Sequence, residues 1–468
     1  MTVPSPKLAP KCQYNYINTF DLTVDLASYE ALMHPWTLRN VLDTFSGALP
    51  ASGYSFDHPL YDPVSNAEVS SHGFSFHHDL GNWPLSVGPG TDPVFDDYMG
   101  AEQLQNWILS AGLYWSRTGD SAWLTNNATL LQTCLGSLLL RDNPTASVRN
   151  GIPKYVNDPE LTTFDDLDPS LRNAPYSGRL TVRSWACYVA LQAMFGQIGD
   201  STDAATSQGM AATVAQTIVT AWNSNRGTLG FIPALLDGSS PSAIIPMVEG
   251  LAYPAQMGLT NAIDRTGGPY SAMLQALAGH LAAVLVPGRC LNATSGAWDM
   301  TSSTGYQNDH KIWHSKVYTA QYVAEQVLGM SGPNINGTVD QVHATIMAQN
   351  APFYEFSDEN DATGADRYVG GCHYPRGITS ALWWLNATNN PSSVLPSTGT
   401  NISASLQNGT LTISWPASYV GWILQTNAVN VANQAAWGDL PGSATNQQMT
   451  FPAASGSIPA EFFRLRHP

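Results

Sequence analysis

Apolar residues recur at helical spacing along most of the chain, in segments separated by long loops rich in Gly, Pro and Asp. After Tyr98, for example, apolar side chains share one helix face at Leu104, Trp107, Ile108, Ala111 and Trp115. Further helices are expected near 122–140, 180–195, 273–284 and 313–328, and these belong to about ten such segments between Asp21 and Asn386. No alternation of strands with helices is seen, which argues against a parallel α/β sheet. The pattern therefore predicts a mainly α fold.

The loops between the expected helices hold most of the Asp, His and Asn residues. Long loops on a helical scaffold are where functional sites usually lie. A ring of helical hairpins with its loops gathered at one end, the (α/α)6 barrel, fits this arrangement.

The character of the sequence changes at Asn389. Residues 389–400 are rich in Ser, Pro and Thr and predict a linker, and alternating runs follow at 402–406, 411–415, 421–424 and 462–465. Asn408-Gly409 between the first two runs is a strong hairpin signal. We therefore expect a helical domain over 1–388, a linker over 389–400 and a small all-β sandwich module over 401–468, with its last strand closing the sheet. The tryptophans of this module form its core or bind a polysaccharide, and its small size favours the core for Trp415, Trp422 and Trp437.

Composition excludes several classes of partner. The 468 residues carry a net charge of −16, and only 12% are charged. A nucleic-acid binder or a protein of anionic membrane surfaces needs the opposite charge, and no apolar run approaches the roughly 18 residues that span a bilayer. The five cysteines form no CxxC pair, and nucleotide, hydride-transfer and serine-nucleophile motifs are missing from the sequence. We expect no metal, no cofactor, no nucleic acid and no membrane partner.

The loop around Asp165 carries a candidate catalytic acid. Glycoside cleavage needs two carboxyl groups across the scissile bond, one of which gives a proton to the leaving oxygen. Asp165 has apolar neighbours and precedes a helix, so partial burial would favour its protonated form. The alternative is that Asp165, Asp166 and Asp168 are turn and N-cap residues.

Two further stretches combine histidine, aspartate and arginine. His77, His78 and Asp79 are either structural or hydrogen-bond to sugar hydroxyls, whereas a metal site would need a partner cluster that the sequence does not offer. Arg376, after Tyr374-Pro375, presents a fork of donors that suits a carboxylate or a sugar hydroxyl. The alternative for Arg376 is a cap on the preceding loop.

Taken in order, these motifs resemble the catalytic domain of glycoside hydrolase family 52, the retaining β-xylosidases. The resemblance covers roughly residues 11–388, with matching segments at 18–25, 35–43, 75–81, 102–109, 162–171, 244–251 and 374–383. The bile-acid β-glucosidase family looks similar at the same loops. The resemblance implies an (α/α)6 barrel preceded by a large β-sandwich, and hydrolysis of non-reducing terminal β-D-xylosyl units. The implied partner is a xylose-containing oligosaccharide or an aryl β-xyloside, and the implied setting is xylan degradation.

The resemblance also implies residue roles. Asp165 falls on the family's general acid/base, and Lys316 lies in a matching segment. The positions implied to bind the substrate are Asp21, His78, Asp79, Arg376 and Glu249.

One departure from the family motif bears on mechanism. The family nucleophile is the first Glu of Asn-Glu-Gly-Glu-Tyr, and this chain reads Pro10-Lys-Cys-Gln-Tyr14 there. Lys11 and Gln13 form no glycosyl ester. The expectations are a β-xylosidase-type hydrolase or a catalytically inactive carbohydrate-binding relic or fragment, with β-glucosidase-like specificity as a further alternative.

The start of the chain gives expectations of its own. The family's upstream β-sandwich is expected to be absent, and residues 1–10 do not form a signal peptide. The C-terminal module loosely resembles modules on exported bacterial enzymes, so export from a bacterium is one expectation and the compartment stays open.

Overall fold

The fold was analysed in a computed structural model of the chain. The structure describes residues 18–47, 54–80, 99–157, 175–303, 311–348, 358–363, 377, 380–384 and most of 402–466. The chain divides into a helical unit, made of Met1–Ser116 and Asp120–Thr388, and a second unit made chiefly of Asn389–Pro468. Each unit is described by itself.

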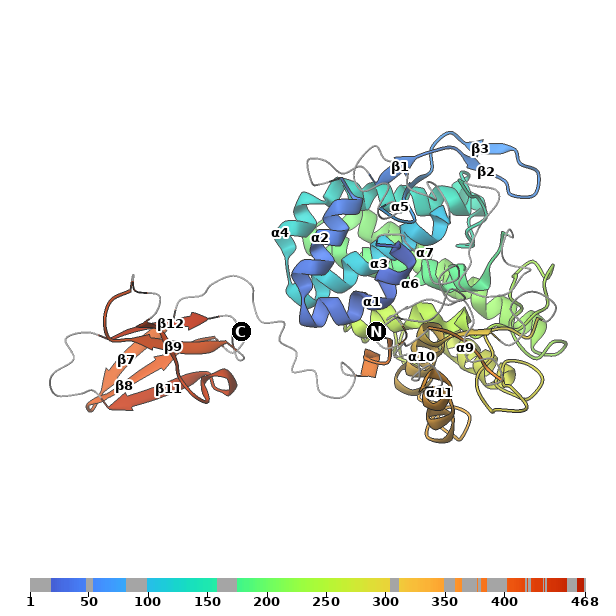
Figure 1. The fold of residues 1–468 in the computed structure, drawn as a ribbon. Coiled ribbons are helices and arrows are strands. Elements are labelled where there is room, and N and C mark those ends of the chain that lie inside the picture. The colour runs from blue at the N-terminus through green and yellow to red at the C-terminus, as the bar shows by residue number, and fades with distance from the viewer. Residues whose placement is uncertain are drawn as a thin grey trace, which may run out of the picture. The chain divides into compact units, whose positions relative to one another are not determined.

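Helices form most of the described part of the helical unit (Figure 1). Its α-helices are α1 (Phe20–Met33), α2 (Pro35–Phe45), α3 (Gly100–Thr118), α4 (Ser121–Asn126), α5 (Ala128–Asp142), α6 (Gly178–Ile198), α7 (Ser201–Asn225), α8 (Ala252–Gln256), α9 (Ser271–Val284), α10 (His314–Tyr322) and α11 (Thr338–Ala348). Two 3-10 helices, η1 (Ala146–Val148) and η2 (Pro246–Leu251), and one π-helical turn, η3 (Val323–Val327), complete the set. The predicted mainly α class is confirmed.

The helix ends follow local chemistry that the apolar pattern shows only in part. The single helix expected over 122–140 is two helices, because Asn127 ends α4 and begins α5. The side-chain amide of Asn127 donates to the carbonyl of Trp123 at 2.9 Å, which satisfies an end of α4. Helix α6 begins at Ser177, whose hydroxyl caps the N–H of Leu180, and ends at Gly199 with φ at 82°.

Short antiparallel hairpins lie among the helices. Strand β1 (Ser55–Asp57) pairs with β4 (Phe74–Phe76), and β2 (Leu60–Tyr61) pairs with β3 (Glu68–Ser70). Strand β5 (Lys311–Trp313), just before α10, pairs with β6 (Glu359–Asp361). Figure 1 shows the strands β1, β2 and β3 at one edge of the helical unit.

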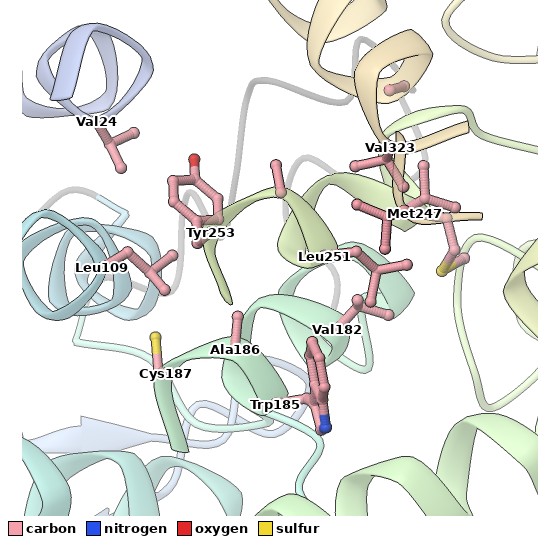
Figure 2. Packing of buried hydrophobic residues seen from close by; sticks show 14 of the residues in the cluster. Val24, Leu109, Val182, Trp185, Ala186, Cys187, Met247, Leu251, Tyr253 and Val323 are labelled. Atoms are coloured by element: carbon pink, nitrogen blue, oxygen red, sulfur yellow. The ribbon is translucent and has the colours of Figure 1, made fainter. Parts of the chain in front are cut away.

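The core of the helical unit is one continuous apolar cluster to which most of its helices contribute. Figure 2 shows part of it: Val24 of α1, Leu109 of α3, Trp185 of α6, Leu251 of η2 and Tyr253 of α8 lie around a common interior. Because these residues are far apart in the sequence, their packing brings the inner faces of five separate elements together. Burial of this apolar surface is the main stabilising contribution.

The second unit contains two three-stranded antiparallel sheets. One has the order β11–β8–β7 and the other β10–β9–β12, and the strands are β7 (Ser403–Gln407), β8 (Thr410–Ser414), β9 (Ile423–Asn427), β10 (Gly438–Asp439), β11 (Gln448–Pro452) and β12 (Phe462–Arg466). Asn408 and Gly409 both have positive φ and join β7 to β8, as the hairpin signal predicts. A short 3-10 helix, η7 (Ser443–Thr445), precedes β11.

A small apolar cluster is shared by the two sheets of this unit. Trp415 and Trp422 belong to it, which agrees with the expectation that they form the core. Trp437 differs, because it is partly exposed and the guanidinium of Arg464 lies 4.2 Å from its ring centroid. A cation over its face leaves this ring in a different environment from the other two.

Two histidines inside the helical core have hydrogen bonds that require the neutral ring. The backbone N–H of Ile232 donates to Nδ1 of His280 at 3.1 Å, and Nε2 of His280 lies 2.9 Å from the carbonyl oxygen of Ile244. One ring nitrogen therefore accepts while the other donates, which only neutral imidazole can do. His343 has the same arrangement, with one backbone N–H and one side-chain carbonyl as its partners.

We expect the free energy of unfolding of the helical unit to fall as the pH drops below about 6.5. Burial lowers the pKa of His280 from 6.5 to about 4, so between these values the unfolded chain binds a proton that the folded chain does not. The contribution of His280 is therefore complete above the unfolded pKa and is lost as the pH falls to the folded one, by on the order of 3 kcal/mol. Urea unfolding across this window measures the loss, and NMR titration of the His280 ring assigns it. Protonation of that ring near pH 6.5 in the folded protein would contradict the expectation.

Candidate active site

Asp21, His78 and Asp79 come together although two of them are far from the third in the sequence. Nδ1 of His78 lies 3.0 Å from an oxygen of Asp79, and Nε2 lies 3.5 Å from an oxygen of Asp21. An imidazole between two carboxylates has an acceptor facing each nitrogen, so its ring orientation is fixed from both sides. We call these three residues the histidine site.

Local backbone structure explains how the sequence forms the histidine site. Asn18 adopts a left-handed conformation, with φ at 51°, which asparagine tolerates better than most residues and which turns the chain into α1. The N–H of Phe20 at the start of this helix donates to the carbonyl oxygen of His78 at 2.8 Å. The first turn of α1 is thereby joined to the segment after β4, and Asp21 is placed beside His78.

The preceding histidine has a different environment. His77 packs against aromatic rings, 5.1 Å from Phe56 and 6.2 Å from Tyr54 between ring centroids. Its backbone N–H donates to the carbonyl of Tyr54 at 2.9 Å. The structural alternative for His77 therefore agrees with its contacts.

The three residues of the histidine site differ in how much of their surface is exposed, and this difference limits the role that each can take. Asp79 has 0% of its surface exposed, His78 has 5% and Asp21 has 8%. Asp79 therefore orients the ring from inside, whereas Asp21 and the edge of His78 are the parts that solvent or a ligand can reach.

A second group of buried polar side chains lies deeper, where five elements meet. Its members are fully or almost fully buried, and we call them the charge cluster: Asp25, Glu102, Arg179, Arg183, Glu249 and Lys316. Three acids face three bases, so the cluster is neutral overall. Burial of unpaired charges is costly, and this balance is what makes the arrangement tolerable.

Glu249 of η2 is the centre of the charge cluster. One of its oxygens accepts from Nε of Arg179 at 2.7 Å, and the other accepts from Arg183 at 2.5 Å and from Lys316 at 3.0 Å. The hydroxyl of Tyr253 also lies 3.3 Å from the second oxygen. Burial alone raises the pKa of Glu249, but the three cations outweigh it and hold that pKa well below its usual range. Glu249 is therefore an ionised anchor and not a proton donor.

The remaining acids connect the cluster to other helices. Lys316 of α10 donates to Asp25 of α1 at 3.0 Å, and Arg179 of α6 contacts Glu102 of α3 at 2.7 Å. The amide oxygen of Asn106 accepts from Arg183, which extends the network along α3. The charge cluster thus links α1, α3, α6, η2 and α10.

Helix α1 joins the histidine site to the charge cluster. Asp21 and Asp25 are four residues apart on this helix, so their side chains lie one above the other on one face. Asp21 contacts His78, and Asp25 contacts Lys316.

The structure describes only some of the site residues that the sequence predicts. Asp21, His78 and Asp79 form one group, while Glu249 and Lys316 belong to the buried cluster. Lys11, Asp165 and Arg376 lie outside the described residues.

Sequence reasoning missed Asp25, Glu102, Arg179 and Arg183 as members of a site. A usable signal was present, because Arg179 and Arg183 lie one turn apart in an otherwise apolar helix of a chain with only 12% charged residues.

The part of the chain that the structure describes contains neither a metal-binding cluster nor a membrane-spanning helix. No group of three or more His, Cys, Asp or Glu side chains there is arranged to hold a metal ion. None of the helices in those same ranges has the length and apolar character needed to cross a bilayer.

Comparison with known proteins shows which family and which proteins this chain is similar to. Residues 10–114 match the family described as glycosyl hydrolase family 52. A β-xylosidase of Geobacillus stearothermophilus is 34% identical over 384 residues, which cover 79% of this chain and 52% of that protein. A second β-xylosidase of the same organism is 33% identical over 206 residues, which cover 41% of this chain and 32% of that protein. The chain spans about half the length of the first of these relatives and about a third of the second.

These matches identify the chain as a relative of the glycoside hydrolases. The particular family that it resembles is glycosyl hydrolase family 52, so the resemblance that the motifs indicate is confirmed.

Proposed function

We propose that this chain acts on terminal β-D-xylosyl units, with Asp165 as the residue that protonates the leaving oxygen. The observation that carries the proposal is the histidine site: Asp21, His78 and Asp79 are in contact and only Asp21 and His78 keep an exposed edge. A carboxylate held by a fixed imidazole is a suitable partner for adjacent sugar hydroxyls. Arg376 would add a planar fork of donors to the same sugar.

We further propose that the helical unit is an (α/α)6 barrel, and that the chain is organised as a helical domain over 1–388 and a β-sandwich over 401–468. Support for the barrel comes from the charge cluster, whose members project from five separate elements toward one interior. Such convergence is compatible with a ring of helices. Glu249 in this proposal is a positioning residue that fixes the inner helices around the sugar pocket.

The proposed mechanism uses only groups of this chain. Asp165 gives its proton to the departing oxygen as the bond from that oxygen to the anomeric carbon breaks. Since Lys11 forms no glycosyl ester, a water molecule must attack the opposite face of the sugar. Asp21, which keeps 8% of its surface exposed, would accept a proton from that water, and the expected product has inverted configuration.

Replacing Asp165 with Asn should lower the rate of xylobiose hydrolysis by about 10²–10⁴-fold, because a sugar leaving group needs a proton. Hydrolysis of p-nitrophenyl β-xyloside should fall less, because nitrophenolate leaves without one. Asp166→Asn is the matched control, since it removes a neighbouring carboxylate of the same loop. Equal effects of the two substitutions on xylobiose would exclude the assigned role.

A second function is favoured by the lysine at position 11. Loss of a catalytic nucleophile costs many orders of magnitude, so a chain that binds sugar without turnover is the alternative. Calorimetry with xylose and xylobiose distinguishes the two, because the alternative expects saturable binding with no release of product.

A further inference from the structure

A pocket of about 390 Å³ opens between α6, α7 and the loop that follows α8. Its volume lies in the range of small-molecule sites. It is lined by Val189, Gln192, Ala193, Gly196, Gln208, Gly258, Leu259, Thr260, Asn261, Ala262, Pro269 and Tyr270. We call it the amide pocket, after Gln192, Gln208 and Asn261.

The amide pocket is separate from the histidine site and the charge cluster. Arg183, the member of the cluster nearest to it along α6, precedes Val189, the first lining residue on that helix, by six residues. At the rise of an α-helix this separation is about 9 Å. None of the pocket's lining residues belongs to either group.

The chemistry of the lining indicates an uncharged ligand rich in hydroxyl groups. No lining residue is charged, and within the described part of the chain no hydrogen bond engages the side chains of Gln192, Gln208 or Asn261. Each amide offers donors and an acceptor at the spacing of neighbouring hydroxyls. Pro269 and the ring of Tyr270 supply an apolar surface for the C–H face of a sugar.

We propose that the amide pocket is a second saccharide-binding site, for a neutral sugar of one to three units, on the outside of the helical unit. Anionic ligands are disfavoured because the chain carries a net charge of −16 and the pocket holds no cation. A peptide is disfavoured because helices and a loop line the pocket, with no strand edge to pair an extended backbone. The inference does not depend on the proposed catalytic function.

The position of the Tyr270 ring indicates that the amide pocket is formed before a ligand binds. The Tyr270 ring lies edge-on to Trp185 of the core, with 5.3 Å between ring centroids. This contact on the core side fixes the orientation of the Tyr270 ring. Gly196 adds no side chain, and a Cβ there would meet no atom within 4 Å, which leaves the mouth of the pocket open. A fixed floor and an open mouth reduce the entropic cost of binding a ring-shaped ligand.

The test is titration of the full chain with xylotriose, followed by calorimetry and ligand-observed NMR. Gln208→Ala combined with Asn261→Ala should weaken binding by about tenfold or more, because each lost hydrogen bond contributes a few-fold. Ala193→Trp, which fills the pocket, should abolish the binding of xylotriose at the pocket and leave any binding at the catalytic site. Gln216→Ala is the matched control, since Gln216 is an exposed glutamine of α7 outside the pocket.

The outcomes separate the pocket from the catalytic proposal. Hydrolysis of p-nitrophenyl β-xyloside, measured in the same variants, should not change, so loss of binding with unchanged activity supports the pocket alone. Binding that is unaffected by all pocket substitutions, or no binding of xylotriose to the chain, overturns the proposal. Binding of N-acetyl-triglycine amide in preference to xylotriose would overturn the assignment to saccharides. Gln208 and Asn261 are exposed, so their replacement leaves the fold intact and melting curves verify this.

Discussion

Replacing Lys11 with glutamate should raise hydrolysis of p-nitrophenyl β-xyloside by about a hundredfold or more. By the family resemblance, position 11 is expected to correspond to the nucleophile of the motif, where a carboxylate attacks the anomeric carbon and is later released by water. An ammonium group cannot form that ester, and its positive charge opposes the oxocarbenium character of the transition state. Glutamate removes both obstacles at once.

The matched control for this substitution is Lys11→Gln. Glutamine removes the charge and keeps the size of glutamate, but it forms no ester. A gain in Lys11→Glu alone therefore reports nucleophilic catalysis, whereas equal gains report only relief of electrostatic repulsion. A fluorinated xylosyl fluoride should add one sugar unit to the peptide that contains residue 11 in the glutamate variant, and a change from inverted to retained product should accompany it. If Lys11→Glu is no more active than Lys11→Gln, the correspondence of position 11 with the nucleophile is wrong.

Glu249→Gln should destabilise the helical unit by about 3–5 kcal/mol. The substitution leaves Arg179, Arg183 and Lys316 facing two acids, so one positive charge remains uncompensated in the interior. Because the cluster joins five elements, the loss affects the packing of the inner helices and not one local contact. Urea unfolding followed by circular dichroism measures the change.

Two further variants show whether charge balance is the cause. Lys316→Met alone should also destabilise, but Lys316→Met combined with Glu249→Gln restores neutrality and should cost less than the sum of the single changes. Arg39→Gln is the control for an exposed ion pair, since the Arg39 side chain is 47% exposed and contacts Asp43 at 3.3 Å. A loss in Glu249→Gln no larger than in Arg39→Gln would show that the cluster does not hold the helices together.

Helix positions could be predicted from the sequence because they depend on local spacing. The apolar face of α3 and the end of α9 before Pro287 follow from residues within one or two turns. The break between α4 and α5 was missed, since it depends on the side chain of a single asparagine that caps a helix from inside an apolar run.

The candidate site could be predicted only in part. The grouping of Asp21 with His78 and Asp79 follows from motif resemblance, because nothing in their spacing brings them together. Glu249 is an example: the resemblance predicts a substrate-binding residue, which stays a prediction, while its ion pairs with Arg179, Arg183 and Lys316 inside the protein could not be foreseen.

Sequence alone was enough to predict the mainly α class, the change to β-strands after residue 400 and the resemblance to family 52, together with a lysine at the position that this resemblance assigns to the nucleophile. These are properties of local spacing or of residue identity, and both can be read without coordinates. Only the tertiary structure decided that three acids and three bases from five elements neutralise one another, and that three uncharged amides line a separate pocket. Such groups are formed by contacts between residues far apart in the chain, and no local pattern encodes which distant charge or amide a given side chain will meet.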